Sequence, residues 1–144
     1  MLPEYERILF ATDGSESANA ALQKAVGIAR RNNAKLFVLH VLDSRVLHAT
    51  SASDHKIQER MKTGGDTIMS RAKDYAAEQG VSDVEILLES GDPKKVIGID
   101  IPERENIDLI VMGAKGTGAM ERFFIGSVSE NVVRHATCDV LVIR

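Results

Sequence analysis

Five short apolar runs, each separated from the next by a stretch with helical periodicity, are the feature that most constrains this chain. The run at residues 35–42 is almost continuously apolar, as a parallel strand covered on both faces requires. Alternating strands and helices predict an α/β fold, a doubly wound five-stranded parallel sheet with four helices. The predicted strands are residues 7–12, 35–42, 84–88, 108–112 and 139–143, and the predicted helices begin near residues 17, 54, 93 and 127.

Two of the predicted helices contain residues that disfavour a regular helix. Gly64 and Gly65 interrupt the helical pattern of residues 54–79 and indicate either a close packing contact or a bend. Pro102 is expected to kink the third helix or to end it early, because proline lacks the N–H that a helix interior needs.

Helix starts can be predicted at two places from capping residues. Asp92 followed by Pro93 is a typical entry, with a capping side chain before a proline at the first helical position. Ser127 and Glu130 have the spacing of a capping box, which predicts Ser127 as the N-cap of the last helix.

The composition favours one globular domain over residues 1–144. Hydrophobic residues make up 44% and charged residues 27%, and the net charge of −3 gives no reason to expect nucleic-acid binding. The sequence has no apolar tract long enough to predict a membrane span, and residues 1–7 do not resemble a signal peptide. We therefore expect a cytoplasmic protein. Cys138 is the single cysteine and is interpreted as a small buried apolar residue.

Sheets of this class bind ligands beyond the carboxyl ends of their strands, where the winding direction reverses. The strand order 3-2-1-4-5 places that reversal between the first and fourth strands. The residues that follow these two strands, 12–14 and 113–118, are rich in glycine and turn residues. The topology therefore predicts a ligand site between them.

The segment from Gly113 to Ser127 has the composition of a phosphate-binding loop. Its glycines allow a close backbone approach, and it leads into a helix whose first N–H groups can bind anions. The P-loop pattern fails, because Ala119 follows Gly118 where lysine is needed, and the dinucleotide pattern fails at Glu121. Lys115 and Arg122 are equally consistent with phosphate contacts and with solvated loop charges.

The spacing Gly113-x2-Gly116-x9-Gly126-Ser127 resembles the ATP-binding branch of the universal stress protein family. Asp13 after the first strand, His40-Val41 in the second and residues 126–138 strengthen the resemblance, which spans the chain. It implies an adenine nucleotide alpha hydrolase-like fold that binds ATP.

The resemblance also implies roles for particular residues. Asp13 and the backbone of Val41 would hold the nucleoside, and the glycine loop with the start of the last helix would hold the phosphates. Taken singly, Asp13 could be a turn residue and Ser127 a helix cap; together they favour a site. The predicted set is Thr12, Asp13, Val41, Met112, Gly113, Gly116, Gly126, Ser127, Val128 and Ser129.

The predicted activity is that of a regulatory, stress-response ATP binder. No catalytic residue is predicted, because Glu121 and Thr117 are not convincingly placed as a base. Slow ATP hydrolysis or a nucleotide-dependent enzyme, and a nucleotide-independent interaction scaffold, stay as alternatives. Mg²⁺ would enter with the triphosphate.

The histidines favour no protein metal site. His48, His55 and His135 lack paired ligand spacing, and His40 is interpreted as a packed or hydrogen-bonded side chain.

The last strand predicts self-association. Val140, Leu141, Val142 and Ile143 would lie at an edge of the sheet and are too apolar to stay unpaired, so we expect a homodimer through this strand. The family resemblance implies the same dimer.

Overall fold

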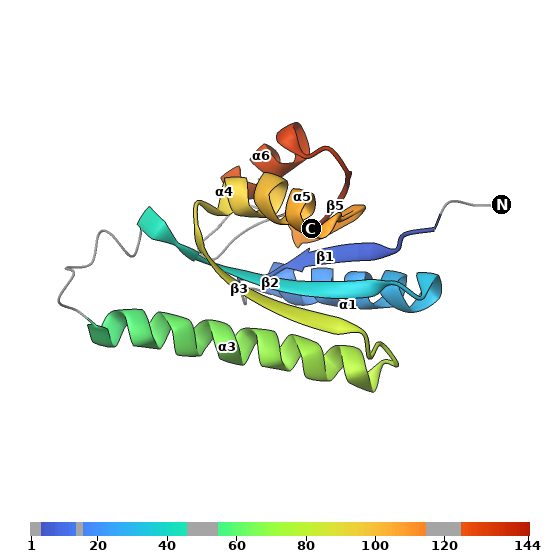
Figure 1. Cartoon of the computed structure of the whole chain (residues 1–144), viewed down its shortest axis with the longest axis horizontal. Helices are drawn as coiled ribbons and strands as arrows, with labels where there is room; N and C mark the ends of the chain where they lie inside the picture. Colours follow the sequence, from blue (N-terminus) through green and yellow to red (C-terminus); the bar gives the residue numbers. More distant parts are fainter. Residues whose placement is uncertain (1–3, 14–15, 46–54, 115–124) are drawn as a thin grey trace.

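The computed structural model describes residues 4–13, 16–45, 55–114 and 125–144. In this part of the chain, five parallel strands form one sheet in the order β3-β2-β1-β4-β5 (Figure 1). The predicted fold class and strand order are confirmed. The strands are β1 (Arg7–Ala11), β2 (Lys35–Asp43), β3 (Val84–Gly91), β4 (Leu109–Gly113) and β5 (Asp139–Ile143).

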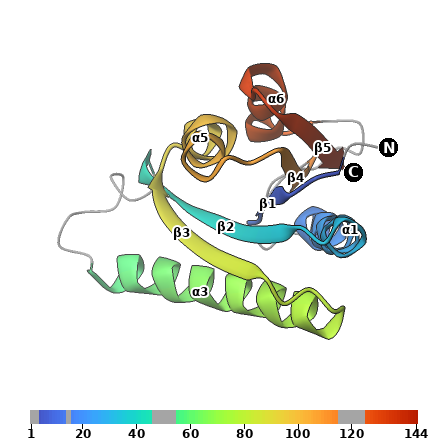
Figure 2. The ribbon, with the colours of Figure 1, turned by 45° about the vertical axis from the view of Figure 1, so that its right-hand side comes forward.

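Helices cover both faces of the sheet (Figure 1, Figure 2). Helices α1 (Glu16–Asn32) and α3 (His55–Glu78) pack on one face. On the other face lie α6 (Ser127–His135) and a helical segment made of α4 (Pro93–Lys95), the π-helical turn η1 (Val96–Asp100) and α5 (Ile101–Glu105). None of the described helices is long and apolar enough to cross a bilayer.

Alternate residues of the central strand β1 fill the two halves of the core. Ile8 and Phe10 are buried against α1 and α3, whereas Leu9 and Ala11 are buried on the side of α5 and α6. Leu9 lies between Phe37 of β2 and Ile110 of β4 in the parallel register. Burial on both faces explains why the strands are almost continuously apolar.

The expected early end of the third helix at Pro102 is wrong, because a π-helical turn accommodates the proline. The helix continues to Glu105, and the Ile101 N–H donates to the Val96 carbonyl in an i→i+5 bond. Widening the helix by one residue just before the proline relieves the clash between its ring and the preceding turn. Asp92 caps the start of this segment as predicted, accepting a bond from the Lys94 N–H at 3.1 Å.

Gly65 marks a close packing contact in α3. A Cβ atom built there would lie 2.7 Å from Cδ2 of His40 in β2, a distance that real Cβ atoms do not reach. At Gly64 a Cβ atom would meet no atom within 4 Å. Of the two alternatives predicted for the glycine pair, the structure shows the packing contact, and it assigns it to Gly65 alone.

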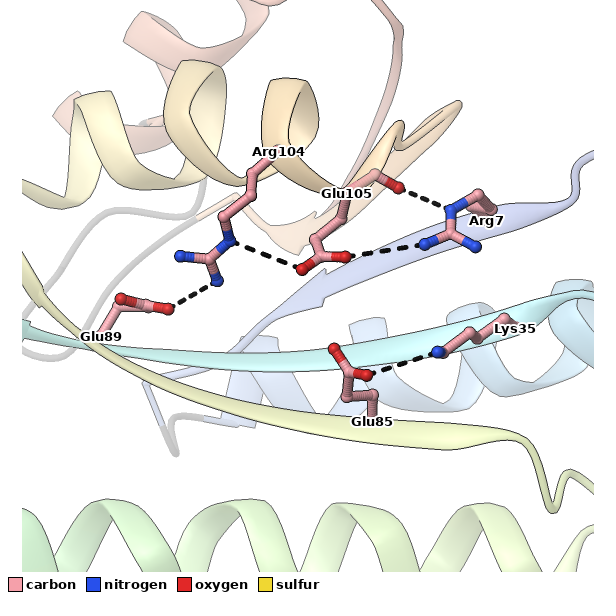
Figure 3. A network of polar contacts seen from close by, with 6 residues as sticks. All are labelled: Arg7, Lys35, Glu85, Glu89, Arg104 and Glu105. Carbon is pink, nitrogen blue, oxygen red and sulfur yellow. Dashed lines mark hydrogen bonds and ion pairs between the residues drawn. The ribbon is translucent and has the colours of Figure 1, made fainter.

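Ion pairs connect α5 to the strands beneath it (Figure 3). The Glu105 carboxylate lies 3.6 Å from Arg7 of β1 and 3.5 Å from Arg104, and Arg104 lies 2.7 Å from Glu89 of β3. Lys35 and Glu85, 3.3 Å apart, join β2 to β3. These side chains are partly exposed, so each pair contributes about 0–1 kcal/mol. The pairs of Glu105 with Arg7 and of Arg104 with Glu89 chiefly orient α5 on the sheet.

Candidate functional site

The winding of the sheet reverses between β1 and β4, which are hydrogen-bonded neighbours. After β1 the chain enters α1 on one face, and after β4 it reaches α6 on the other (Figure 2). The last paired residues are Ala11 and Met112, so the two strand exits lie side by side. This topological switch point is where parallel sheets bind ligands.

The β1 exit is held by its neighbour β2. The Thr12 N–H donates to the Leu39 carbonyl at 2.9 Å, which extends the strand ladder by one residue. The Thr12 carbonyl lies 2.8 Å from Nδ1 of His40. Asp13, the predicted nucleoside-binding residue, therefore follows a backbone unit whose two polar groups are both bonded to β2.

The β4 exit and the start of α6 are tied together. The Ala114 N–H donates to the Ile143 carbonyl of β5 at 2.7 Å, and the Gly126 N–H donates to the Ala114 carbonyl at 2.6 Å. The Ser129 hydroxyl donates to the Gly113 carbonyl at 2.7 Å, and Ser129 is 3% exposed. Both ends of the predicted glycine loop therefore meet at the carboxyl end of β4.

Gly113 is required by its contact with α1. A Cβ atom at this position would lie 2.9 Å from the carbonyl carbon of Ser17, in the first turn of the helix. The Ser17 hydroxyl donates to the Ile143 carbonyl at 3.2 Å, so α1, β4 and β5 converge here. Ser17 was not among the predicted site residues, because a serine at the start of a helix gives no sign in the sequence of a contact with a residue so distant in the chain.

The predicted capping box at the start of α6 is wrong. The N-cap is Gly126, with extended backbone angles and no side-chain capping bond, and Ser127 is the first helical residue. The Glu130 side chain instead accepts from Arg134 at 2.8 Å. The Glu130 N–H, bonded to the Gly126 carbonyl, begins the helical ladder, so the N–H groups of Ser127, Val128 and Ser129 precede it at the positive end of the helix dipole.

Two of the remaining predicted site residues lie in strands, and Gly116 lies outside the described residues. Met112 is buried in β4, and Val41 lies in the part of β2 that extends past the end of β1. Outside the described residues lie Gly116, Lys115, Arg122, Thr117, Gly118, Glu121 and His48, and the same holds for the side chain of His55.

Two other predicted side chains have clear surroundings. Cys138 is half-buried beside the α5–α6 half of the core, and its burial raises the pKa of the thiol. The interpretation of His40 as a packed, hydrogen-bonded side chain is confirmed. Within the described residues no group of three or more acidic, histidine or cysteine side chains could hold a metal ion.

The sequence and the fold both match known proteins. The sequence model of the universal stress protein family matches residues 4–144. A relative from Staphylococcus aureus (strain USA300), named for the same family, is 45% identical over 140 residues, which cover 97% of this chain and 84% of the relative. The solved structure of the universal stress protein UspA from Lactobacillus plantarum has a TM-score of 0.87 at 34% identity and covers 99% of this chain and 100% of its own.

Two similar structures were solved with adenine nucleotides. One is a universal stress protein in complex with cAMP, with a TM-score of 0.75 at 26% identity over 99% of this chain and 98% of that one. The other is the universal stress protein from Archaeoglobus fulgidus in complex with dAMP, with a TM-score of 0.70 at 25% identity over 99% and 100%. With the family match over nearly its whole length and the shared sheet order, this chain belongs to the universal stress protein family.

Proposed function

We propose that this protein binds an adenine nucleotide, and specifically ATP with Mg²⁺, at the carboxyl ends of β1, β2 and β4. The observation that most supports the proposal is the bond from the Gly126 N–H to the Ala114 carbonyl. It holds the N-terminus of α6 against the β4 exit, beside the exit of β1. A helix N-terminus at a switch point is well suited to phosphate groups.

The proposal divides the site into a nucleoside side and a phosphate side. Asp13, which lies two residues past the end of β1, and the backbone of Val41 would bind the nucleoside. The N–H groups of Ser127 and Val128 and the exposed Ser127 side chain would bind phosphate oxygens. Mg²⁺ would be bound through the phosphates.

Ser129 receives a different role from the one that the sequence suggested. Its hydroxyl already donates to the Gly113 carbonyl and its side chain is buried. We propose that Ser129 positions the glycine loop with its side chain and that only its backbone N–H faces the phosphates. Gly113 and Gly116 stay in the proposed site as positions of close backbone approach, Gly113 with a packing reason of its own.

The proposed role is regulatory binding in the cytoplasm, with ATP hydrolysis slow at most. Calorimetric titration tests it with ATP, ADP and AMP, and GTP serves as the base-specificity control. We expect ATP to bind and Asp13→Ala and Ser127→Ala each to weaken it about tenfold or more, because each removes a polar contact to the ligand. No heat of binding for any adenine nucleotide would overturn the proposal and favour an interaction scaffold.

A hydrolysis assay on the same samples separates a binder from an enzyme. Single-turnover conversion of ATP near the rate in buffer is expected. Fast turnover that is lost in Ser127→Ala would assign the protein to the enzymes.

We also propose a homodimer through β5. In the described sheet β5 pairs with β4 alone, and Val140 and Val142 are half-buried without a second neighbouring strand. Pairing with β5 of a second copy about a two-fold axis would satisfy the edge. Light scattering at micromolar concentration is expected to give twice the chain mass, and a monomeric mass would contradict the dimer.

A further inference from the structure

His40 and Thr12 form a contact that fixes the tautomer of the imidazole. Nδ1 of His40 lies 2.8 Å from the Thr12 carbonyl oxygen, which can only accept a hydrogen bond. Nδ1 must therefore bear the proton. The half-buried histidine thus acts as a directed donor to the β1 exit and is not merely packed there.

This bond completes the fixation of the last backbone unit before Asp13. The Thr12 N–H is bonded to the Leu39 carbonyl at 2.9 Å, and the carbonyl of the same residue is bonded to His40. Leu39 and His40 are adjacent in β2, so a single strand holds both polar groups. Without His40, the Thr12 carbonyl would lose this bond to β2, and the peptide unit that leads into Asp13 would be held less firmly.

Gly65 of α3 provides the space for the imidazole. A Cβ atom there would lie 2.7 Å from Cδ2 and 3.4 Å from Nε2 of His40, and 3.2 Å from Cδ1 of Leu88. The imidazole could not yield freely, because the ring is bonded to Thr12 at its other side. The absence of a side chain at position 65 therefore determines where the ring of His40 lies.

We propose that His40 is a positioning residue of the candidate nucleotide site, and that Gly65 seats it. His40 touches no proposed ligand group; it acts through the Thr12 carbonyl on the direction of Asp13. The inference rests on the proposed function for the identity of the ligand. It adds that α3, remote from the phosphate loop in sequence, is coupled to the nucleoside side of the site.

Calorimetric ATP titration of two variant pairs tests the coupling in the full-length protein. His40→Leu removes the donor, whereas His40→Asn keeps an amide N–H at the position of Nδ1. Gly65→Ala displaces the ring, whereas Gly64→Ala makes the same change where nothing lies within 4 Å. We expect His40→Leu and Gly65→Ala to weaken ATP binding about tenfold, and both controls to stay within about threefold of wild type.

The amide signals of the ligand-free protein give a readout that does not depend on ATP. His40→Leu and Gly65→Ala are expected to shift the NMR signals of Thr12 and Asp13, and Gly64→Ala to leave them in place. If these signals do not move, or if all four variants bind ATP like wild type, the proposal is overturned. If wild type binds no ATP while the signals move as expected, the proposed function fails and the positioning of the β1 exit by His40 stands.

Discussion

Gly113 of β4 and Ser17 of α1 touch so closely that no side chain fits between them. A Cβ atom at position 113 would lie 2.9 Å from the carbonyl carbon of Ser17 and 3.0 Å from its Cβ. The first glycine of the loop motif thus has a packing role at the junction of α1, β4 and β5. Substitution there disturbs the fold as well as any ligand contact.

Gly113→Ala is expected to lower the free energy of unfolding by about 1–3 kcal/mol, because the added methyl group must push the first turn of α1 away. Urea denaturation without nucleotide measures the change. Stability equal to that of wild type would show that the contact relaxes without cost. Because Gly113→Ala is expected to disturb the fold, a loss of ATP binding in this variant would not show a ligand contact. The Ser127→Ala variant is the suitable test of such a contact.

The two serines of α6 should separate stability from binding. Ser129→Ala removes the buried donor to the Gly113 carbonyl and is expected to cost about 1–3 kcal/mol of stability. Ser127→Ala, at an exposed position with no capping bond, is expected to stay within about 0.5 kcal/mol of wild type. Urea midpoints of the two variants measured side by side would contradict this assignment if Ser127→Ala were the more damaging change.

The glycine pair of α3 predicts opposite changes at neighbouring positions. Gly64→Ala should raise stability by about 0.5–1 kcal/mol, because alanine is the better helix former and its methyl group meets open space. Gly65→Ala should lower stability, since its Cβ would collide with His40. Thermal unfolding of both variants is the measurement, and an equal shift in the same direction would refute the packing contact.

Tyr5 predicts a loss of stability at alkaline pH. Its hydroxyl donates to Oδ2 of Asp139 at 2.7 Å, and this hydrogen bond to a carboxylate raises the pKa of Tyr5 above its usual 10.0. Because the folded state holds the proton more tightly, the contribution is fully present below about pH 10 and is lost as the pH rises through the folded-state pKa.

Tyr5→Phe should remove the part of the alkaline loss of stability that comes from Tyr5. Tyr75→Phe, which changes the other tyrosine of the chain, serves as the matched control. Urea midpoints on both sides of pH 10 give the comparison. An alkaline loss of the same size in wild type and Tyr5→Phe would show that the Asp139 contact does not contribute.

The fold was predictable because its strands are buried on both faces. An almost continuously apolar run such as residues 35–42 is typical of a strand that is buried on both faces. The alternation of such runs with helical segments restricts the fold to a small number of doubly wound sheet topologies. The proposed position of the ligand site rests on the same topology. These predictions depend on patterns that persist over many residues.

Two details that the sequence missed are local choices of the backbone, and a third depends on a contact between distant segments. Pro102 was expected to kink its helix or to end it early, yet the helix continues past it to Glu105 by way of a π-helical turn. Ser127 and Glu130 match a capping pattern, but Gly126 lies one residue earlier in the extended conformation and takes the N-cap. The contact of Gly65 with His40 needs the packing of α3 on β2, which no local spacing encodes.

Backbone amide NMR during a titration with ATP and Mg²⁺ tests the central claim most directly. The account predicts saturable shifts at both sides of the switch point, for Thr12, Asp13 and Val41 on one side and Gly126, Ser127 and Val128 on the other, with GTP giving weaker changes. Unchanged signals at these residues, or saturable shifts confined to another face of the sheet, would contradict it.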